Sequence, residues 1–411
     1  MNITIIGTGY VGLTAAICFA NEGHKVICID KDPTKIAMLK ARKSPIYEKN
    51  MEEMLCKAID NDNIEFSTDL KYGIKNSIIN ILAVGTPQDE KSGEADLCYI
   101  MSASKEMAEY INEYKLIIIK STVPIGTNHK VQKIIEENSG QKIDIASNPE
   151  FMREGFAIED FMKPDRIVAG VQNKKSQKLI EELYQNWIKN NFSILFTDVK
   201  TAELIKYSSN AFLMTKIAFI NEISNLCEAS GCNISDLTKA MGMDERIGSK
   251  FLNPGPGIGG SCFPKDSLAL SHIAKEYKQK LSILDQVIDS NNQRFADMAE
   301  KIKKITSDNK KIAILGLAFK AGTDDVRMSP AIEIIKHLLK DNFQITAFDP
   351  EAIENSKKIL DDQINYCQNI KECFNSAHYV VILTEWLEFK EIKNYNNFND
   401  KVIIDLRNLL E

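Results

Sequence analysis

One short segment places a thiol, an ammonium and a carboxylate within five residues. It reads Gly259-Gly260-Ser261-Cys262-Phe263-Pro264-Lys265-Asp266. Pro264 suits the first turn of a helix, and the apolar residues that follow predict the buried face of that helix. Cys262 is therefore expected at a helix N-terminus, where N–H groups stabilise a thiolate and the two glycines would let a substrate approach the backbone. A buried structural cysteine is the alternative.

A second segment predicts a site for a dinucleotide. Gly7-Thr8-Gly9-Tyr10-Val11-Gly12 follows a strand-like run and opens a helix, and a second strand ends at Asp30. The glycines permit a tight turn with pyrophosphate at the helix N-terminus, and an acidic residue about 20 positions on accepts from a ribose 2′-OH. Asp30 would repel a 2′-phosphate, so NAD is favoured over NADP, although Lys31 and Lys35 weaken the preference. A glycine-rich turn without cofactor is the alternative.

Length and composition set the class of protein. A chain of 411 residues predicts two or three domains. Its apolar runs are too short for a transmembrane helix, and no signal peptide precedes the first strand, so a cytoplasmic location is expected. Nine cysteines without a CxxC pair favour reduced thiols over disulfides or a zinc site, and no metal is expected. The net charge of -6, without a Lys/Arg-rich run, argues against nucleic acid as a partner.

The elements that must position these residues alternate along the first half of the chain. Helix-like stretches separate several strand-like runs, which predicts a parallel sheet flanked by helices. The runs are Ile3–Ile6, Lys25–Ile29, Ile78–Val84, Leu116–Ile119 and Ile143–Ala146. From about Thr201 to Ala240 the apolar residues recur at helical spacing, without Pro or Gly before Gly231. A helix of about 30 residues there would join two domains or support a dimer interface, although a buried core helix fits much of its apolar face equally well.

The last hundred residues resemble the first. Ile345-Thr346-Ala347-Phe348-Asp349 parallels Val26-Ile27-Cys28-Ile29-Asp30, which indicates a divergent repeat without a second G-x-G. Ser329-Pro330 predicts the N-cap and first turn of a helix. The expected fold is α/β, with two Rossmann-like doubly wound domains joined by a central long-helix dimerisation segment. The predicted domains are 1–198 for NAD binding, 199–308 for the central segment with Cys262, and 309–411 for the C-terminal Rossmann-like domain.

Further motifs connect these regions to a known family. They are Val84-Gly85-Thr86-Pro87, Lys120 to Thr127, Asn148 to Gly155, Lys206 with Asn210, and Lys320 to Pro330. With the two segments above, they closely resemble the UDP-glucose/GDP-mannose dehydrogenase family from Met1 to the C-terminus. The resemblance implies an oxidoreductase with an NAD-binding domain, a central dimerisation segment and a UDP-binding C-terminal domain. In its UDP-glucose branch, the sugar C6 alcohol becomes a carboxylate at the expense of two NAD and one water.

The resemblance also implies catalytic roles. Thr122 and Asp266 would hold a water that helps remove the hydroxyl proton. Cys262 would attack the resulting aldehyde, and the thiohemiacetal would be oxidised to a thioester.

The remaining catalytic roles fall on three polar residues. Lys206 and Asn210, four apart and so on one helix face, would donate to the oxyanion. Glu150 would promote the water that hydrolyses the thioester. Each role has a structural alternative. Lys206 could be a solvated lysine, Asn210 a satisfied amide and Thr122 a turn cap. Glu150 could form a salt bridge to Arg153 or Lys163.

Binding residues follow from the same resemblance. Those expected to contact NAD are Gly7, Gly9, Tyr10, Val11, Gly12, Asp30, Lys35, Thr86, Thr122, Glu154, Lys265 and Arg327. Those expected to contact the UDP-sugar are Glu150, Phe151, Met152, Arg153, Glu154, Lys206, Asn210, Arg246, Phe251, Leu252, Asn253, Pro254, Gly255, Gly259 and Lys320. Arg246 would reach the substrate of the neighbouring subunit in a homodimer. Glu154 would lie one helical turn beyond Glu150 if that segment is helical.

One departure and three rivals remain. Pro45-Ile46-Tyr47-Glu48-Lys49-Asn50-Met51 lacks the Pro-Gly turn that many relatives have there, which leaves its conformation open. The nearest alternative is a related enzyme that acts on GDP-mannose or a UDP-N-acetylhexosamine. The motif S-C-F-P-K-D, however, resembles that of the UDP-glucose branch. A two-electron hydroxyacid dehydrogenase leaves Cys262 and the C-terminal domain unexplained. An NAD-binding regulatory module would not need the thiol or the oxyanion donors.

Overall fold

The computed structural model describes residues 1–89 and 93–410, and the chain divides into two compact units, Met1–Ser208 and Ser209–Glu411. Glu411, which ends the last predicted domain, lies outside the described residues. The boundary between the units falls within α10 (Val199–Ser230), a helix of 32 residues that confirms the helical periodicity of this region. The division into three domains with boundaries near 198 and 308 stays a prediction.

The first unit is built on a sheet that has eight strands among the described residues, in the order β3-β2-β1-β4-β5-β6-β7-β8. The strands are β1 (Asn2–Ile6), β2 (Lys25–Ile29), β3 (Ile64–Ser67), β4 (Ile79–Leu82), β5 (Leu116–Ile119), β6 (Asp144–Ser147), β7 (Ile167–Gly170) and β8 (Ile194–Thr197). Neighbours pair in parallel except β6 and β7. Because β1 pairs with both β2 and β4, the strand order reverses there, which is where dinucleotides bind in such sheets.

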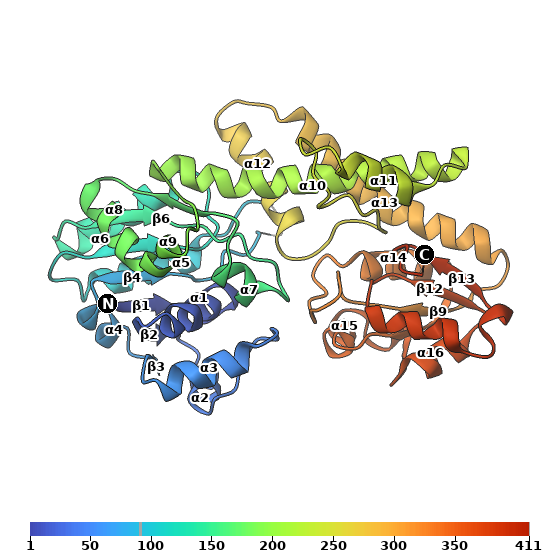
Figure 1. The fold of residues 1–411 in the computed structure, drawn as a ribbon, viewed down its shortest axis with the longest axis horizontal. Helices are drawn as coiled ribbons and strands as arrows, with labels where there is room; N and C mark the ends of the chain where they lie inside the picture. The colour runs from blue at the N-terminus through green and yellow to red at the C-terminus, as the bar shows by residue number, and fades with distance from the viewer. Residues whose placement is uncertain (90–92, 411) are drawn as a thin grey trace. The chain divides into compact units, whose positions relative to one another are not determined.

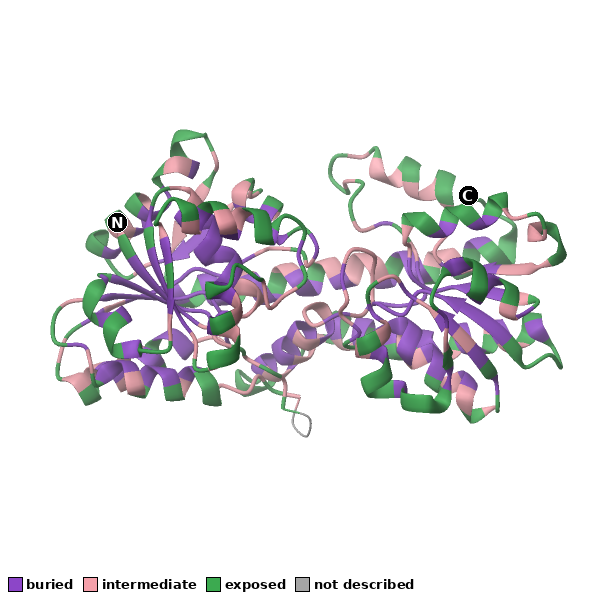
Figure 2. Cartoon of the chain, turned by 90° about the horizontal axis from the view of Figure 1, so that it is seen from below, coloured by how far each residue is buried: buried purple, intermediate pink, exposed green. Residues whose placement is uncertain are grey.

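Helices cover both faces of this sheet (Figure 1). Alternate strand residues face opposite sides, so the central strands are apolar nearly throughout and buried, as Figure 2 shows, whereas β8 is only partly buried. One face packs on α1 (Tyr10–Asn21), α3 (Met51–Asp60), α7 (Ala157–Met162), α8 (Lys174–Leu183) and α9 (Gln185–Lys189). The other packs on α4 (Leu70–Asn76), α5 (Cys98–Ala108) and α6 (Thr127–Ser139), while α2 (Pro33–Lys40) follows β2.

The second unit carries a parallel sheet in the order β11-β10-β9-β12-β13, five strands within the described residues. The strands are β9 (Lys311–Leu315), β10 (Gln344–Phe348), β11 (Asn365–Tyr366), β12 (Tyr379–Ile382) and β13 (Val402–Asp405). One face packs on α13 (Ser282–Thr306), α14 (Pro330–Lys340) and α15 (Ile353–Leu360), and the other on α16 (Ile370–Ser376) and the 3-10 segment Leu387–Asn394. The order repeats that of β3-β2-β1-β4-β5, in agreement with the predicted repeat.

Two shorter helices complete the second unit: α11 (Ile234–Gly242) and α12 (Phe263–Glu276), the latter packed on α13. Ser329 is the N-cap of α14 as predicted, but its hydroxyl makes no capping bond, because it donates to the Leu317 carbonyl at 2.7 Å instead. In the described part of the chain, no helix is long and apolar enough to cross a membrane.

Candidate active site

The glycine-rich turn joins β1 to α1 with the geometry that a dinucleotide needs. Gly7 has φ 99°, and a Cβ on Gly12 would lie 1.9 Å from the Gly7 carbonyl oxygen, so helix and strand approach as closely as glycine permits. A Cβ on Gly9, the N-cap of α1, would meet nothing within 4 Å. Space is therefore open beside the first N–H groups of α1, where a pyrophosphate is stabilised, and the residues present fit NAD.

Asp30 follows β2 beside this turn. Its Oδ2 accepts from the Thr8 N–H at 2.8 Å and the Thr8 hydroxyl at 2.6 Å, and its Oδ1 accepts from the Asp32 N–H at 3.0 Å. Burial would raise the pKa of Asp30, but these hydrogen bonds and Lys35 outweigh it and hold the pKa below its ordinary value. The carboxylate is therefore charged and fixed beside Thr8 of the glycine-rich turn, where a ribose hydroxyl is predicted to donate to it.

Two hydrogen bonds join the loop after β4 to the loop after β5. The Thr86 hydroxyl donates to the Thr122 carbonyl at 2.9 Å, and the Ser121 hydroxyl donates to the Val84 carbonyl at 2.6 Å. Two residues predicted to contact NAD from distant motifs are thus adjacent.

Glu48 is a site-supporting residue that the sequence argument missed. Its buried carboxylate accepts from the Tyr10 hydroxyl, from the Gly155 N–H at 2.8 Å and from the Ala157 N–H at 3.0 Å. It thereby ties the start of α1 to the turn that carries Glu154. Asn50, which precedes α3, takes the left-handed conformation with φ 63°.

Glu150 and Lys206 form a buried ion pair. The Lys206 Nζ donates to Glu150 Oε1 at 2.8 Å, and the two side chains are 4% and 9% exposed. Lys206 is therefore not a solvated helix lysine. Burial would raise the pKa of Glu150, but Lys206, the Met152 N–H and the charge of Lys120 hold it below its ordinary value.

The segment from Glu150 to Glu154 is not helical, so the conditional placement of Glu154 one helical turn beyond Glu150 is wrong. The Glu150 carboxylate accepts from the Met152 N–H at 2.6 Å, and α7 begins only at Ala157. Arg153 is exposed and pairs with Asp160 at 2.6 Å rather than with either glutamate.

In the second unit, Cys262 is the N-cap of α12, as predicted. Its Sγ lies 3.6 Å from the Ser261 hydroxyl. In the first turn of the helix, Asp266 is buried; its Oδ2 accepts from the Asn210 amide at 2.6 Å, and its Oδ1 lies 2.9 Å from the Lys265 ammonium. A thiol, a carboxylate, an ammonium and an amide therefore share one helix terminus.

The two glycines before Cys262 are closely packed on the side where a Cβ would stand, and the approach of substrate to their backbone stays a prediction. A Cβ on Gly259 would lie 2.3 Å from the Met328 carbonyl oxygen, and one on Gly260, with φ 87°, would lie 2.7 Å from the Phe319 ring. The Gly260 N–H donates to the Arg327 carbonyl at 3.0 Å. The loop that carries the thiol is thus pressed against the loop before α14.

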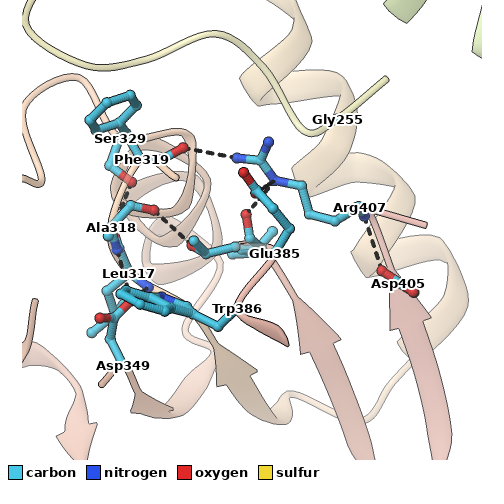
Figure 3. A network of polar contacts seen from close by, with 12 residues as sticks. Gly255, Leu317, Ala318, Phe319, Ser329, Asp349, Glu385, Trp386, Asp405 and Arg407 are labelled. Atoms are coloured by element: carbon cyan, nitrogen blue, oxygen red, sulfur yellow. Dashed lines mark hydrogen bonds and ion pairs between the residues drawn. The ribbon is translucent and has the colours of Figure 1, made fainter. Parts of the chain in front are cut away.

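Side chains from other elements support the loop that is predicted to bind the UDP-sugar. The Gly255 N–H donates to Asn221 Oδ1 at 2.8 Å, and the Gly255 carbonyl accepts from Arg294 Nε at 2.7 Å. Arg407 lies against Gly255, with its guanidinium bonded to the Phe319 and Leu383 carbonyls (Figure 3). None of these three supporting side chains was expected from the sequence.

Two of the other predicted cations, Arg327 and Arg246, are exposed, and Lys320 is partly buried. Arg327 pairs with Asp325, and Arg246 pairs with Asp244 at 2.6 Å with its side chain 89% exposed. The Lys320 ammonium lies 5.6 Å from the centre of the Phe319 ring.

Asp349 follows β10 as Asp30 follows β2, but the two carboxylates have different surroundings. It is fully buried, and its Oδ2 accepts from the Leu317 and Ala318 N–H groups at 2.7 and 3.0 Å and from the Trp386 indole at 3.1 Å (Figure 3). Because the indole covers the carboxylate, this turn does not offer the acceptor that Asp30 offers.

The predicted residues thus form one group in each unit. The first unit gathers the glycine-rich turn, Asp30, Thr86 with Thr122, and the Glu150–Lys206 pair; the second gathers Asn210, Cys262, Lys265 and Asp266. Lys206 and Asn210 lie four residues apart in α10. A glycine-rich strand-to-helix turn at the point where the order of a parallel sheet reverses, followed by an acidic residue after the second strand, is typical of a nucleotide-dependent dehydrogenase.

Comparisons with known proteins identify the family within this class. Residues 1–188, 200–293 and 313–411 match the NAD binding, central and UDP binding domains of the UDP-glucose/GDP-mannose dehydrogenase family. The chain belongs to this family, and its cofactor is NAD.

Individual relatives agree. The chain is 46% identical over 419 residues to UDP-glucose 6-dehydrogenase of Rickettsia felis, covering 100% of this chain and 93% of the relative. A UDP-glucose dehydrogenase structure from Pyrobaculum islandicum has a TM-score of 0.94 at 32% identity, covering 100% of this chain and 95% of that one. A UDP-D-ManNAc dehydrogenase structure from Pyrococcus horikoshii has a TM-score of 0.87 at 26% identity, with coverages of 100% and 96%.

Proposed function

We propose that this protein oxidises UDP-glucose to UDP-glucuronate with NAD, through covalent adducts on Cys262. The observation that carries the proposal is the Cys262 thiol at the N-terminus of α12. Asp266 lies buried one turn further along this helix and accepts a hydrogen bond from the buried Asn210 amide. An alcohol dehydrogenase that stops at the aldehyde needs no nucleophile, whereas oxidation to a carboxylate does. The identity to UDP-glucose 6-dehydrogenases over the whole chain supports UDP-glucose as the substrate.

Each step has a residue suited to it. NAD, held at the glycine-rich turn and Asp30, would supply the hydride acceptor for both oxidations. Thr122 and Asp266 hold the water that takes the C6 hydroxyl proton, and the Cys262 sulfur adds to the aldehyde carbon to give a thiohemiacetal. Oxidation of that adduct leaves a thioester.

Two polar groups on α10 stabilise the negative oxygen of these adducts. Lys206 donates from its ammonium and Asn210 from its amide. The buried Glu150 carboxylate, charged because Lys206 lowers its pKa, takes a proton from the water that cleaves the thioester.

We further propose a homodimer in which Arg246 completes the partner's site. Apolar side chains stand exposed along α10, namely Phe212, Phe219 and Leu226 at 66, 50 and 63%. A hollow of about 460 Å³ between α10 and α13 continues this surface. The side chain of Arg246 is 89% exposed, so it is available to a second copy.

A second candidate substrate is a UDP-N-acetylhexosamine, because a UDP-D-ManNAc dehydrogenase shares the fold with a TM-score of 0.87. The test is a panel of UDP-glucose, UDP-galactose, UDP-GlcNAc, UDP-ManNAc and GDP-mannose with NAD, and with NADP as a control. We expect two NADH per UDP-glucose and little turnover of the others. One NADH per sugar, or a preference for another sugar or for NADP, would contradict the proposal.

A further inference from the structure

Lys120 carries a buried ammonium for which the proposed mechanism has no use. It follows β5, its side chain is buried, and its Nζ donates to Asn148 Oδ1 at 3.0 Å and lies 3.4 Å from the Tyr184 hydroxyl oxygen. The Tyr184 hydroxyl itself donates to Asn148 Oδ1 at 2.6 Å. Each of these partners is uncharged, although burying a cation is costly unless an anion compensates it.

Aromatic side chains enclose this ammonium. The Nζ lies 5.2 Å from the centre of the Phe161 ring. Tyr184 packs edge-on against Phe19 and Trp187, with ring centres 5.4 Å apart in both pairs. Burial lowers the pKa of Lys120 to about 8. A buried cation that titrates this near neutrality is costly to retain for packing alone and is typical of functional sites.

The contact with Asn148 leads to Glu150. The Asn148 amide donates to the Val168 carbonyl at 2.8 Å, and the Asn148 N–H donates to the Ile119 carbonyl at 2.9 Å. Asn148 is thus fixed between β5 and β7, two residues before Glu150. Lys120 therefore holds the backbone immediately before Glu150.

Ionisable groups from several elements act on Lys120. The ionisable groups that face it are Glu150 after β6, Lys206 on α10, Cys18 on α1 and Tyr184 before α9. Burial raises the pKa of both Cys18 and Tyr184, so these two groups are neutral. The ammonium groups of Lys120 and Lys206 therefore both act on the Glu150 carboxylate, and positive charge beside it suits a site where a negative oxygen develops.

We propose that Lys120 is a positioning residue for Glu150, whose ammonium fixes Asn148 and compensates the Glu150 carboxylate when Lys206 donates to the substrate oxyanion. The inference rests on the proposed roles of Glu150 and Lys206. Without a second cation, the movement of Lys206 toward the oxyanion would leave Glu150 buried and uncompensated, and the carboxylate would take up a proton instead of removing one from water.

The test compares Lys120→Met, Lys120→Arg and the control Tyr184→Phe. Methionine has a similar length and suits the aromatic surroundings, and Asn148 Oδ1 keeps its bond from Tyr184. We expect kcat of the Met variant with UDP-glucose to fall roughly tenfold near pH 7, with KM changed less than about twofold. The acid limb of its kcat profile should rise by about one pH unit, because Glu150 loses a positive neighbour.

The alkaline limb gives the sharper comparison. The wild-type enzyme should show a loss of activity above about pH 8, as Lys120 deprotonates, that the Met variant lacks. The Arg variant, which stays charged, should restore the wild-type acid limb without the alkaline loss. Tyr184→Phe keeps the ammonium and should move neither limb by more than a few tenths of a pH unit.

Urea unfolding supplies a readout that does not depend on activity. Because the folded pKa of Lys120 lies below the unfolded one, the unfolded chain binds more protons between them, and wild-type stability should rise with pH from about 8 to about 10.5. The Met variant should lack this rise and be at least as stable as wild type at pH 7.

Two failures are distinguishable. A Met variant that is less stable than wild type at pH 7 and retains the wild-type pH profile would show that Lys120 is merely structural, and would overturn the inference while the proposed function stands. A wild-type enzyme that forms no NADH from UDP-glucose would overturn the proposed function, and with it the role of Glu150 on which the inference rests.

Discussion

The thiol of Cys262 is the residue on which the proposed chemistry depends. Cys262→Ala should abolish turnover while NAD and UDP-glucose still bind, because the sulfur is needed for the adduct rather than for ground-state contacts. Cys262→Ser should accumulate an ester on the enzyme, since an oxygen ester hydrolyses more slowly than a thioester. Mass spectrometry after mixing with NAD and UDP-glucose measures the adduct. Cys232→Ala, at an exposed thiol of the same unit, is the control and should stay active; multiple turnovers by Cys262→Ala would contradict the mechanism.

The Glu150–Lys206 pair gives a second prediction at this scale. Glu150→Gln leaves the buried Lys206 ammonium without its carboxylate and should cost about 3 kcal/mol in the free energy of unfolding. The double variant with Lys206→Met should recover much of that loss, although both variants should be inactive. Because the pKa of Glu150 is lowered in the folded state, its contribution to stability is lost as pH falls through that lowered pKa. Urea unfolding checks this, and additive losses in the double variant would mean that the two groups do not interact.

At the scale of elements, α10 organises the loops of the first unit. Glu203 is buried on this helix, and its carboxylate accepts from the Gly126 and Asn128 N–H groups at 2.6 and 2.8 Å, which caps the start of α6. Lys206, one turn further along, holds Glu150 after β6. The helix thereby fixes the loop that contains Thr122 relative to the carboxylate.

Removal of this cap is testable. Glu203→Ala leaves buried N–H groups and the Asn128 amide without an acceptor and should cost about 2 kcal/mol of stability, together with a loss of activity. The control is Glu137→Ala, which removes an exposed carboxylate from α6 whose ion pair with Lys133 spans 3.7 Å and should contribute only a few tenths of a kcal/mol. Equal losses in the two variants, measured by urea unfolding, would refute the assignment.

The proposed dimer makes a prediction for the whole molecule. Arg246→Ala and Cys262→Ala homodimers should each be nearly inactive. A mixed dimer combines Cys262 from one chain with Arg246 from the other in one intact site, while its second site carries both defects. Random remixing makes about half of the dimers mixed, so activity should recover to roughly a quarter of wild type for a two-fold arrangement. No recovery after verified subunit exchange would place Arg246 in its own subunit's site or outside it.

The sequence alone determined the framework of the fold and the chemical groups. The buried strands that lead to Asp30 and Asp349 were predictable because a parallel sheet covered on both faces is apolar nearly throughout. The position of Cys262 before α12 followed from Pro264, whose ring suits only the first turn of a helix. Strands β3, β7 and β8 of the first sheet were missed: β3 alternates between buried and exposed residues, β7 contains Ala and Gly, and β8 is only partly buried, so none gives a continuous run of large apolar residues.

Tertiary structure alone decided which partners these groups find. Glu48, Glu203 and Lys120 look like ordinary surface charges in the sequence, yet each is buried against residues more than twenty positions away. The glycines before Cys262 are visible in the sequence, but their close contacts with Met328 and Phe319 are not. Local sequence encodes propensity and capping, which act over a few residues; the burial and hydrogen bonding that set the charge of Glu150 and Lys120 arise only where loops from distant strands meet.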